Sequence, residues 1–433
     1  MIGSTQLHDR DWIHPTISSN KPLVRTSGAI SFHSNEQTKP KIMPIQFLSS
    51  WLTSLNPSIT NNVTIKPTDT GLGGFAPLAG IPPYEIIASI PLQSALTSQA
   101  AASSPLGLAI SATIDSQTAL KQPNPLFVFW LYIASGRDDP NHPKHAYLSS
   151  LPSALADVSS WTLSSAETLQ LKGTNLGVAI DKSNSELQSE LEQYHDFFRA
   201  AHPLLFSKIT IENIRWAKSM YRSRGFPSSL LPPNPVSDST YDGVGILLPL
   251  LDMFNHKRRT KIEWRGTSTA IQFVNGGDKI VGEAQIFNNY GGKSNESLLI
   301  SYGFAIADNE DDAFLLELVI GEMRQTFAIH RSDTDDHEQF PVSLWVALAS
   351  LYEDDDDGEN EDENEEGIAI GIDSVELLLE TLSSRLVLFE NIEKSDQNKN
   401  TTSEREKYIA YYLLGQQLVL SQAVETLKEM AEQ

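Results

Sequence analysis

The spacing of apolar residues changes from helical to strand-like and back again along the first half of the chain. Three apolar side chains at helical spacing within residues 44–56 predict a short amphipathic helix. Short β-branched runs between residues 64 and 92 are broken by Gly and Pro, which is typical of strands joined by turns. From Thr118 to about Arg224 the apolar residues return to helical spacing, so this stretch is predicted to be mostly helical.

The second half of the chain repeats the same change of pattern. We predict a β-rich block from Val244 to Phe304, with a short helical run at residues 295–300 inside it. Beyond Asp308 the spacing is largely helical, and residues 404–432 are predicted to form a long final helix. This order predicts an α+β fold, in which a β-rich domain is split by a helical insert and followed by a mostly helical C-terminal domain.

The same order divides the chain into five predicted segments. Residues 1–45 are rich in Ser, Thr, Pro and Lys without periodicity, so they are predicted to be a flexible N-terminal extension. The other segments are the first part of the β-rich domain (46–117), the helical insert (118–240), the second part of the β-rich domain (241–307) and the helical C-terminal domain (308–433).

The composition excludes several classes of protein. Hydrophobic residues are 40% and charged residues 20%, ordinary values for a globular chain that buries a core. There is no cysteine, which excludes disulfides, a thiolate nucleophile and Cys-based metal sites. No HExxH pattern occurs either, so we expect no bound metal. No apolar run approaches the roughly 18–20 residues that span a bilayer. Because the first ten residues also lack the apolar stretch of a secretory signal, we expect a protein of the cytoplasm or nucleus without a membrane partner.

The formal net charge of −23 is concentrated in one place. Residues 353–366, EDDDDGENEDENEE, contain eleven acidic side chains. Such a block is typical of a solvated, disordered loop, and docking of a basic partner is the alternative interpretation. A net-acidic chain disfavours non-specific binding to nucleic acid and favours a basic protein or peptide as partner.

Three polar side chains end a buried run at residues 247–256, LLPLLDMFNH. These are Asp252, Asn255 and His256. Asp and Asn often cap turns, and a single histidine is commonly a satisfied core residue, so a plain turn is one interpretation. The other is a group of ligand-binding side chains at the end of a buried strand.

Two further segments combine glycine with residues that carry chemistry. Tyr290 and Tyr302 each precede a glycine in NNYGGKSNESLLISYGF at residues 288–304. A tyrosine in such a place either fills space or points its hydroxyl into a narrow cleft. The glycine cluster in TGLGGFA, predicted to form a turn, would let backbone approach a ligand closely, but it lacks the strand–GxGxxG–helix context of a dinucleotide site.

In this order the segments resemble the SET-domain protein methyltransferases of the Rubisco large-subunit lysine methyltransferase type. The matching segments are TGLGGFA, YEIIASIP, HAYLSSLP at residues 145–152, SRGF at 223–226, DMFNH at 252–256 and the YGGKSN…YGF stretch at 290–304. The likeness covers about residues 45–433, since the chain after Asp308 resembles the helical substrate-binding domain of the family. The NH and YG…YGF motifs are its most specific parts.

The resemblance implies S-adenosyl-L-methionine as cofactor and a lysine side chain of a protein as methyl acceptor. Tyr290 would be the catalytic tyrosine, and Arg224 would pair with the methionyl carboxylate of the cofactor. Phe226 and Tyr302 would line the path of the substrate side chain. The implied cofactor-binding residues are Gly71, Gly73, Phe75, Ser104, Leu106, Arg224, Asp252, Asn255, His256, Tyr290, Tyr302 and Phe304.

The implied partner is a non-histone protein such as a ribosomal protein or an elongation factor, and the acidic charge favours a basic one. We expect a monomer that does not bind nucleic acid. Two other functions stay open. A relative of the same fold methylates a histidine of actin, but it carries Asn where this chain has Phe226. The second alternative is a non-catalytic module that binds a basic partner and does not bind the cofactor.

Overall fold

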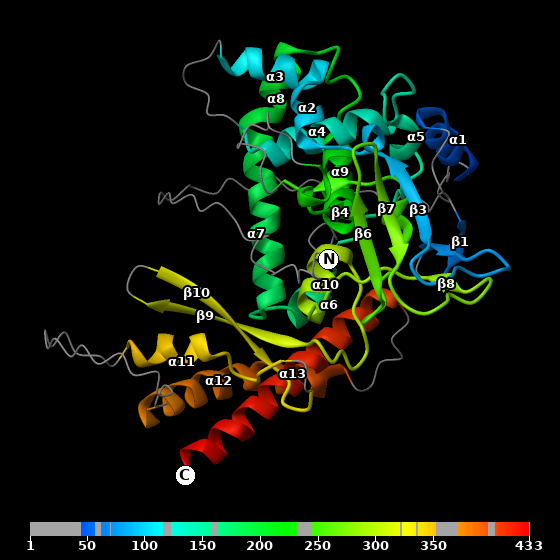
Figure 1. The fold of residues 1–433 in the computed structure, drawn as a ribbon. Coiled ribbons are helices and arrows are strands. Elements are labelled where there is room, and N and C mark those ends of the chain that lie inside the picture. The colour runs from blue at the N-terminus through cyan, green and yellow to red at the C-terminus, as the bar shows by residue number, and fades with distance from the viewer. Residues whose placement is uncertain are drawn as a thin grey trace, which may run out of the picture. The chain divides into compact units, whose positions relative to one another are not determined.

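The computed structural model describes residues 45–56, 62–69, 71–115, 123–157, 163–232, 244–320, 323–334, 337–351, 371–396 and 403–432. Most of the predicted N-terminal extension and all of the acidic block at residues 353–366 lie outside these ranges. The described chain divides into two compact units, whose elements are labelled in Figure 1. Unit 1 comes from Met1–Leu155 and Glu190–Gly291, and unit 2 comes from Ala156–Ser189 and Gly292–Gln433.

Unit 1 is built around small antiparallel sheets (Figure 1). Its strands are β1 (Thr64–Thr68), β2 (Gly71–Phe75), β3 (Ile86–Pro91), β4 (Gly225–Phe226), β5 (Ile246–Leu247), β6 (Ile262–Gly266), β7 (Ala270–Asn275) and β8 (Gln285–Ile286). They pair in the orders β1-β2-β8, β3-β7-β6 and β4-β5. The strands predicted between residues 64 and 92, and the β-rich character of the chain after Val244, are therefore confirmed.

The sheet β3-β7-β6 carries the aromatic core of unit 1. Ile87 and Ile90 of β3 are fully buried, as expected of β-branched residues in a strand. On β7, the Phe273 ring centroid lies 4.8 Å from that of Trp264 and 4.6 Å from that of Phe254. Because Phe254 belongs to the DMFNH segment, this stacking anchors the segment on the sheet.

Helices supply the rest of unit 1, and their caps follow from the sequence. They are α1 (Ile45–Leu55), α2 (Ser98–Ala102), α3 (Pro105–Asp115), α4 (Pro125–Arg137), α5 (His145–Leu148), the π-helical turn η4 (Leu191–His195), α8 (Asp196–Ala201) and α9 (Ile211–Arg224). The Asn124 side chain accepts from the backbone N–H of Leu126 at 2.9 Å, and Pro125 starts α4. The predicted helix at residues 44–56 is α1, and the predicted helical stretch contains α4, α5, α8 and α9, so both predictions are confirmed.

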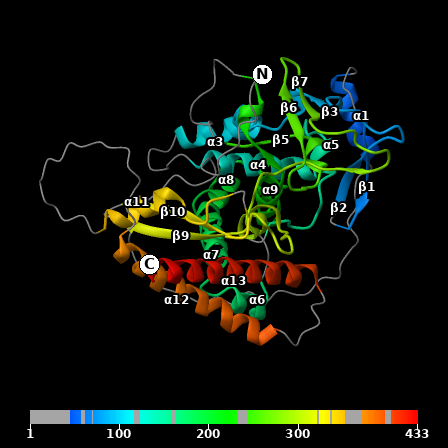
Figure 2. The same cartoon turned by 60° about the horizontal axis from the view of Figure 1, so that its bottom comes forward.

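Unit 2 is mostly helical, as the pattern predicts. Its helices are α6 (Ser165–Gln170), α7 (Asn175–Glu190), α10 (Asn295–Tyr302), α11 (Val342–Ala349), α12 (Ile372–Asp396) and α13 (Glu404–Ala431). Helices α12 and α13 run side by side in Figure 2. Their facing apolar stripes bury Leu382, Tyr412 and Val419 in one core with Leu176 of α7. No helix in the described part of the chain is long and apolar enough to cross a membrane.

The structure also contains a hairpin that the sequence pattern does not predict. Residues after Asp308 form β9 (Ala313–Ile320) and β10 (Met323–His330), which pair antiparallel along their whole length. The apolar run AFLLELVI is eight residues long, too short for periodicity alone to separate a strand from a helix turn. Phe314 and Leu316 are buried whereas Glu317 and Val319 are exposed. In the second half of β9, therefore, only one face of the strand is covered.

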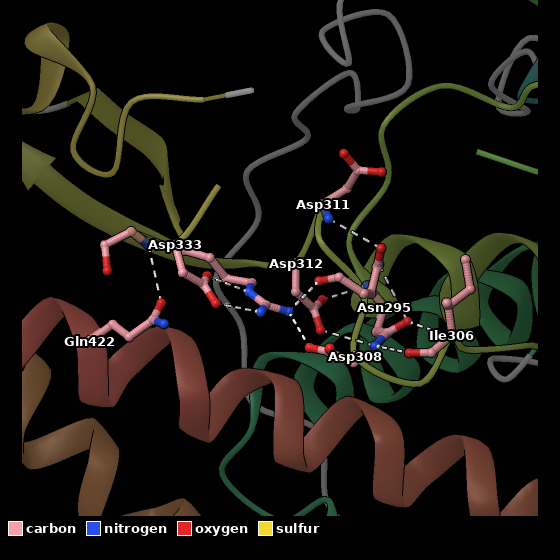
Figure 3. Close-up of polar contacts among 10 residues, drawn as sticks. Asn295, Ile306, Asp308, Asp311, Asp312, Asp333 and Gln422 are labelled. Atoms are coloured by element: carbon pink, nitrogen blue, oxygen red, sulfur yellow. Dashed lines mark hydrogen bonds and ion pairs between the residues drawn. The ribbon is translucent and has the colours of Figure 1, made fainter. Parts of the chain in front are cut away.

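A buried polar cluster fixes the start of α10 (Figure 3). The backbone N–H and the side-chain amide of Asn295 donate to the Asp312 carboxylate at 2.7 and 2.9 Å. Arg331 forms ion pairs with Asp308 at 2.6 Å and with Asp333 at 2.7 Å. The predicted helix at residues 295–300 is confirmed as α10. Unit 2 joins residues 156–189 of the predicted insert to residues 292–433, and the five predicted segments remain a prediction.

Candidate cofactor and catalytic site

The DMFNH segment begins at an unusual backbone turn in unit 1. Strand β5 covers only two residues, and Leu250 then adopts a φ of +74°, a conformation that costs a residue with a Cβ energy. A short 3₁₀ turn at Leu251–Met253 follows. The turn buries the Asp252 side chain completely, so this carboxylate needs polar partners inside the unit.

Arg224 and Tyr147 are those partners. At the end of α9, Arg224 Nη1 donates to Asp252 Oδ2 at 2.9 Å and to the Asp252 carbonyl at 3.1 Å. The Tyr147 hydroxyl on α5 donates to the same carboxylate oxygen at 2.9 Å. Three segments that are far apart in sequence therefore meet at one carboxylate.

Burial and charge act in opposite directions within this group. Burial raises the pKa of Asp252, and the Arg224 guanidinium opposes that rise. Burial would lower the pKa of Arg224, but the Asp252 carboxylate outweighs it, so the pKa of Arg224 lies above its ordinary value. Burial also raises the pKa of Tyr147 well above its ordinary value, which keeps its hydroxyl protonated as a donor.

The group keeps unused hydrogen-bonding capacity. Arg224 Nε and Asp252 Oδ1 are buried and have no hydrogen-bond partner within the described residues. Arg224 was predicted to pair with a carboxylate of the cofactor. In the structure its Nη1 is bound to Asp252, and Nε is the donor that remains for another acceptor.

A second part of the site forms where β2 meets the DMFNH segment. The glycine cluster, predicted to be a turn, forms the strand β2 instead, and Gly71 at its start has a φ of +122°. A Cβ on Gly74 would stand 2.3 Å from the Phe254 ring, and one on Gly73 would stand 3.3 Å from Asn255 Nδ2. Glycine at position 74 therefore lets β2 approach this segment closely, and Gly73 lies beside the Asn255 amide.

Asn255 presents a buried amide next to this strand. Its Nδ2 is buried and has no hydrogen-bond partner in the described parts of the chain. A buried amide without a partner costs roughly 1–3 kcal/mol, so it is a natural donor for a ligand. The close glycine backbone and the unpaired donor together fit a small polar ligand such as the implied cofactor.

The remaining part of the site joins the DMFNH segment to Tyr290. The backbone N–H of Tyr290 donates to His256 Nδ1 at 3.1 Å, and the two rings stack with their centroids 5.1 Å apart. Because Nδ1 accepts this bond, the proton of a neutral His256 ring sits on Nε2. The Tyr290 hydroxyl donates to the Phe254 carbonyl at 3.0 Å. The Asn288 backbone N–H donates to the Asn255 carbonyl at 2.8 Å, which holds the two segments together.

Other predicted residues lie elsewhere in unit 1. Ser104 Oγ accepts from the Gly107 N–H at 3.1 Å and caps α3, in which Leu106 is buried. The Phe75 ring faces Lys66, whose Nζ lies 5.3 Å from the ring centroid. Phe226 packs edge-to-face on Trp264, with the ring centroids 5.1 Å apart. Their assignment to cofactor or substrate remains a prediction.

Tyr302 and Phe304 belong to unit 2. Tyr302 ends α10, and its ring centroid lies 6.2 Å from that of Phe304. Between them Gly303 caps the helix with a φ of +76°, where a Cβ would overlap the Ala156 carbonyl oxygen at 1.6 Å. The assignment of Tyr302 and Phe304 also remains a prediction.

The sequence motifs did not single out Tyr147, Phe254 or Gln285. Tyr147 lies 105 residues from its partner Asp252, and Gln285 Nε2 lies 2.7 Å from where a Cβ on Gly73 would stand. Tyr147 and Phe254 lie within the motifs HAYLSSLP and DMFNH, and Gln285 lies in none of the matching segments. Among the described residues no group of His, Cys, Asp and Glu could hold a metal ion.

Known proteins similar to this chain were found by sequence. No protein-family profile matches the chain. The ribosomal lysine N-methyltransferase set10 of Schizosaccharomyces pombe is 36% identical over 123 residues, which are 28% of this chain and 21% of that protein. Ribosomal lysine N-methyltransferase 1 of Saccharomyces cerevisiae is 28% identical over 207 residues, which are 40% of this chain and 34% of that protein.

A plant relative matches a longer part of the chain. The chloroplastic Rubisco large-subunit N-methyltransferase of Nicotiana tabacum is 26% identical over 343 residues, which are 72% of this chain and 65% of that protein. The chain thus spans less than two thirds of the length of each of these three relatives.

Solved structures with the same fold cover nearly the whole chain. The SET domain of LSMT bound to methyllysine and AdoHcy has a TM-score of 0.69 at 18% identity, over 89% of this chain and 92% of that one. Rubisco LSMT bound to AdoMet has a TM-score of 0.66 at 19% identity, over 90% and 92%. The chain therefore has the α+β fold of these structures, and its resemblance to the SET-domain lysine methyltransferases of the Rubisco large-subunit type is confirmed.

Proposed function

We propose that this protein is an S-adenosyl-L-methionine-dependent protein-lysine N-methyltransferase that acts on a non-histone protein such as a ribosomal protein or an elongation factor. The observation that carries the proposal is the junction of β2 with the DMFNH segment. There the Gly73 backbone lies beside the unpaired amide of Asn255, and the Tyr290 hydroxyl is bound to the carbonyl of Phe254, the residue before Asn255. The relatives named as lysine methyltransferases support it over the parts of the chain that they match.

The proposed cofactor-binding residues fit the chemistry of S-adenosyl-L-methionine. Asn255 offers a buried amide donor, Arg224 Nε offers a second donor with positive charge, and the glycines of β2 offer backbone at short range. When bound, this cofactor supplies a methyl group on a sulfonium sulfur. The full proposed set is Gly71, Gly73, Phe75, Ser104, Leu106, Arg224, Asp252, Asn255, His256, Tyr290, Tyr302 and Phe304.

The acceptor lysine must lose its proton before it can attack. A free lysine has a pKa of about 10.4, and an apolar channel close to positive charge lowers it. Alignment of the amine with the methyl group is the main further requirement. Tyr290 is placed to help, because its hydroxyl donates a hydrogen bond to the Phe254 carbonyl, which leaves the lone pairs of the hydroxyl oxygen to accept an N–H of the amine.

The proposal includes the wider setting of the enzyme. The substrate is a protein, the helical chain after Asp308 contributes to binding it, and Phe226 and Tyr302 line the path of its side chain. The enzyme acts as a monomer in the cytoplasm or the nucleus. The names of the yeast relatives, which refer to ribosomal proteins, support a target in the translation apparatus.

Two measurements test the proposal. Thermal unfolding of the full chain should shift upward with S-adenosyl-L-methionine, since ligand at 100 times its dissociation constant adds about 2.7 kcal/mol of stability. Methyl transfer from labelled cofactor to a ribosomal protein fraction, followed by mass spectrometry, should place the label on lysine. Label on histidine would favour the histidine-methylating alternative, and absence of cofactor binding would favour the binding module.

A further inference from the structure

A hollow of about 350 Å³ lies in unit 1 next to the candidate site. Its lining includes Lys257, Arg258, Arg259 and Lys261, four cations from five consecutive residues, together with the carboxylate of Asp278. This run of four cations stands in a chain whose formal net charge is −23. The volume is at the small end of the roughly 300–1,000 Å³ of ligand sites, so it suits a few residues of an extended chain.

The cationic turn is anchored at both ends. The backbone N–H of Lys257 donates to the Asn288 carbonyl at 2.9 Å, and the N–H of Gly276 donates to the Lys261 carbonyl at 3.1 Å. Between these anchors Arg259 adopts a φ of +59°, a conformation that a residue with a Cβ seldom takes. The backbone therefore presents the cations in a fixed turn, which reduces the entropy that binding would cost.

Another lining residue, Asn275, is equally fixed. Asn275 is 3% exposed, and its side-chain amide donates to the carbonyls of Pro82 at 3.0 Å and Asp278 at 2.8 Å. Its side-chain oxygen accepts from the Gly277 N–H at 3.1 Å. Ile286 and Phe287 add apolar side chains to the lining. A ligand in the hollow would meet the fixed side chain of Asn275 and the apolar side chains of Ile286 and Phe287 as well as the cations.

The hollow is connected to the candidate cofactor site through shared residues. Gln285 lines the hollow, and its Nε2 lies 2.7 Å from where a Cβ on Gly73 would stand. Lys257 follows His256 directly and is bound to Asn288, two residues before Tyr290. A ligand held by the turn would therefore lie next to the segments that carry the candidate chemistry.

We propose that this hollow binds an acidic segment of the protein substrate through salt bridges from the turn at residues 257–261. This inference rests on the proposed function, because it takes the substrate to be a protein. A basic substrate is attracted by this chain, which is acidic as a whole. A short acidic run within the substrate, held in the hollow, would then determine which lysine of the substrate is presented. Nucleic acid fits less well, since it needs an extended basic track and is repelled by the net charge of −23.

Binding of a short labelled peptide to the full chain tests the proposal. The probe is a fluorescent peptide of about eight Glu and Gly residues, and its counterpart carries Gln in place of Glu. The variant R258Q/K261Q removes two cations of the hollow, and K279Q removes an exposed lysine that is not part of its lining. We expect the acidic peptide to bind wild type and K279Q equally, and to bind R258Q/K261Q at least about fivefold more weakly.

Two results would overturn the proposal. One is equal affinity of the acidic peptide for wild type and R258Q/K261Q. The other is tighter binding of a single-stranded RNA of about eight nucleotides than of the peptide, which would assign the hollow to nucleic acid. Cofactor binding, measured by calorimetry on the same proteins, keeps the two proposals apart. If neither wild type nor the two variants bind cofactor, the methyltransferase proposal fails while the peptide result stands. If all three bind cofactor and also bind the acidic peptide with equal affinity, only this inference fails.

Discussion

The hydroxyl of Tyr290 makes a polar contact separate from the stacking of its ring. The hydroxyl donates to the Phe254 carbonyl at 3.0 Å, whereas the ring stacks on His256. Tyr290→Phe should therefore keep the ring and the cofactor affinity, and lower kcat by about 10² or more. Single-turnover methyl transfer and calorimetry measure the two effects separately.

Tyr302→Phe is the matched control, since it deletes the same hydroxyl from the other tyrosine that precedes a glycine. We expect a smaller effect on turnover. Loss of turnover in Tyr302→Phe, together with normal turnover in Tyr290→Phe, would show that the two tyrosines are assigned in reverse.

Asn255 allows a test of cofactor binding that leaves the fold alone. Because its Nδ2 has no hydrogen-bond partner in the described structure, Asn255→Ala removes no hydrogen bond that this amide nitrogen makes within the described part of the chain. We expect the affinity for S-adenosyl-L-methionine to fall about tenfold, the value of one good hydrogen bond, with the unfolding temperature unchanged. Wild-type affinity in this variant would remove Asn255 from the site.

At the scale of elements, the contact of β2 with Phe254 sets how close the strand can lie. A Cβ on Gly74 would meet the Phe254 ring at 2.3 Å, so Gly74→Ala should destabilise the fold by about 1–3 kcal/mol. Urea unfolding measures the loss. Gly371→Ala serves as control, because a Cβ there would meet nothing within 4 Å. Equal stability of the two variants would contradict the close approach.

The start of α10 makes stability depend on pH. Burial, followed by the charge of Asp312, raises the pKa of Glu296 to about 8, from 4.5 in an exposed chain. Between these values the folded state holds a proton that the unfolded state has lost, so stability falls as pH rises. The slope is about 1.4 kcal/mol per pH unit for one proton. Asp312, whose pKa burial raises to about 7, adds to the slope over a narrower range.

Glu296→Gln should therefore flatten this dependence and raise the unfolding temperature at pH 8 relative to wild type. Unfolding curves between pH 5 and 8 measure it. Glu380→Gln, a change at an exposed position of α12, should leave the slope unchanged. An unaltered slope in Glu296→Gln would mean that other groups carry the pH dependence.

Elements with a long and regular pattern could be predicted from the sequence, and contacts between distant segments could not. Helices α1 and α13 follow directly from helical spacing, and strand β3 follows from its isoleucines. The hairpin β9–β10 was missed because an eight-residue apolar run fits either structure. The motif residues Asn255, His256 and Tyr290 do meet in the structure. Their partner Phe254 could not be predicted, because its contact with Gly74 depends on how β2 pairs.

At the scale of the whole molecule, the acidic block at residues 353–366 dominates the charge. It carries eleven carboxylates, and its structure lies outside the described residues. Our leading expectation is that its deletion changes neither stability nor activity, because a longer loop costs little closure entropy. If the block attracts a basic substrate, deletion should raise KM at low salt only, since screening is nearly complete near 1 M.

Methyl transfer to a basic protein fraction at two salt concentrations, for the intact and the shortened chain, distinguishes these outcomes. A loss of kcat that does not depend on salt would contradict both expectations.

The ion pair of Arg224 with Asp252, completed by Tyr147, has a consequence for how this protein can evolve. Each of the three side chains is buried or mostly buried, and each satisfies another, so replacing one alone leaves a charge or a polar group without its partner. The three positions should therefore change together among descendants of one ancestor. In a set of related sequences, a neutral residue at the position of Asp252 should occur together with an uncharged residue at that of Arg224, and lineages with only one of the two changes should be rare.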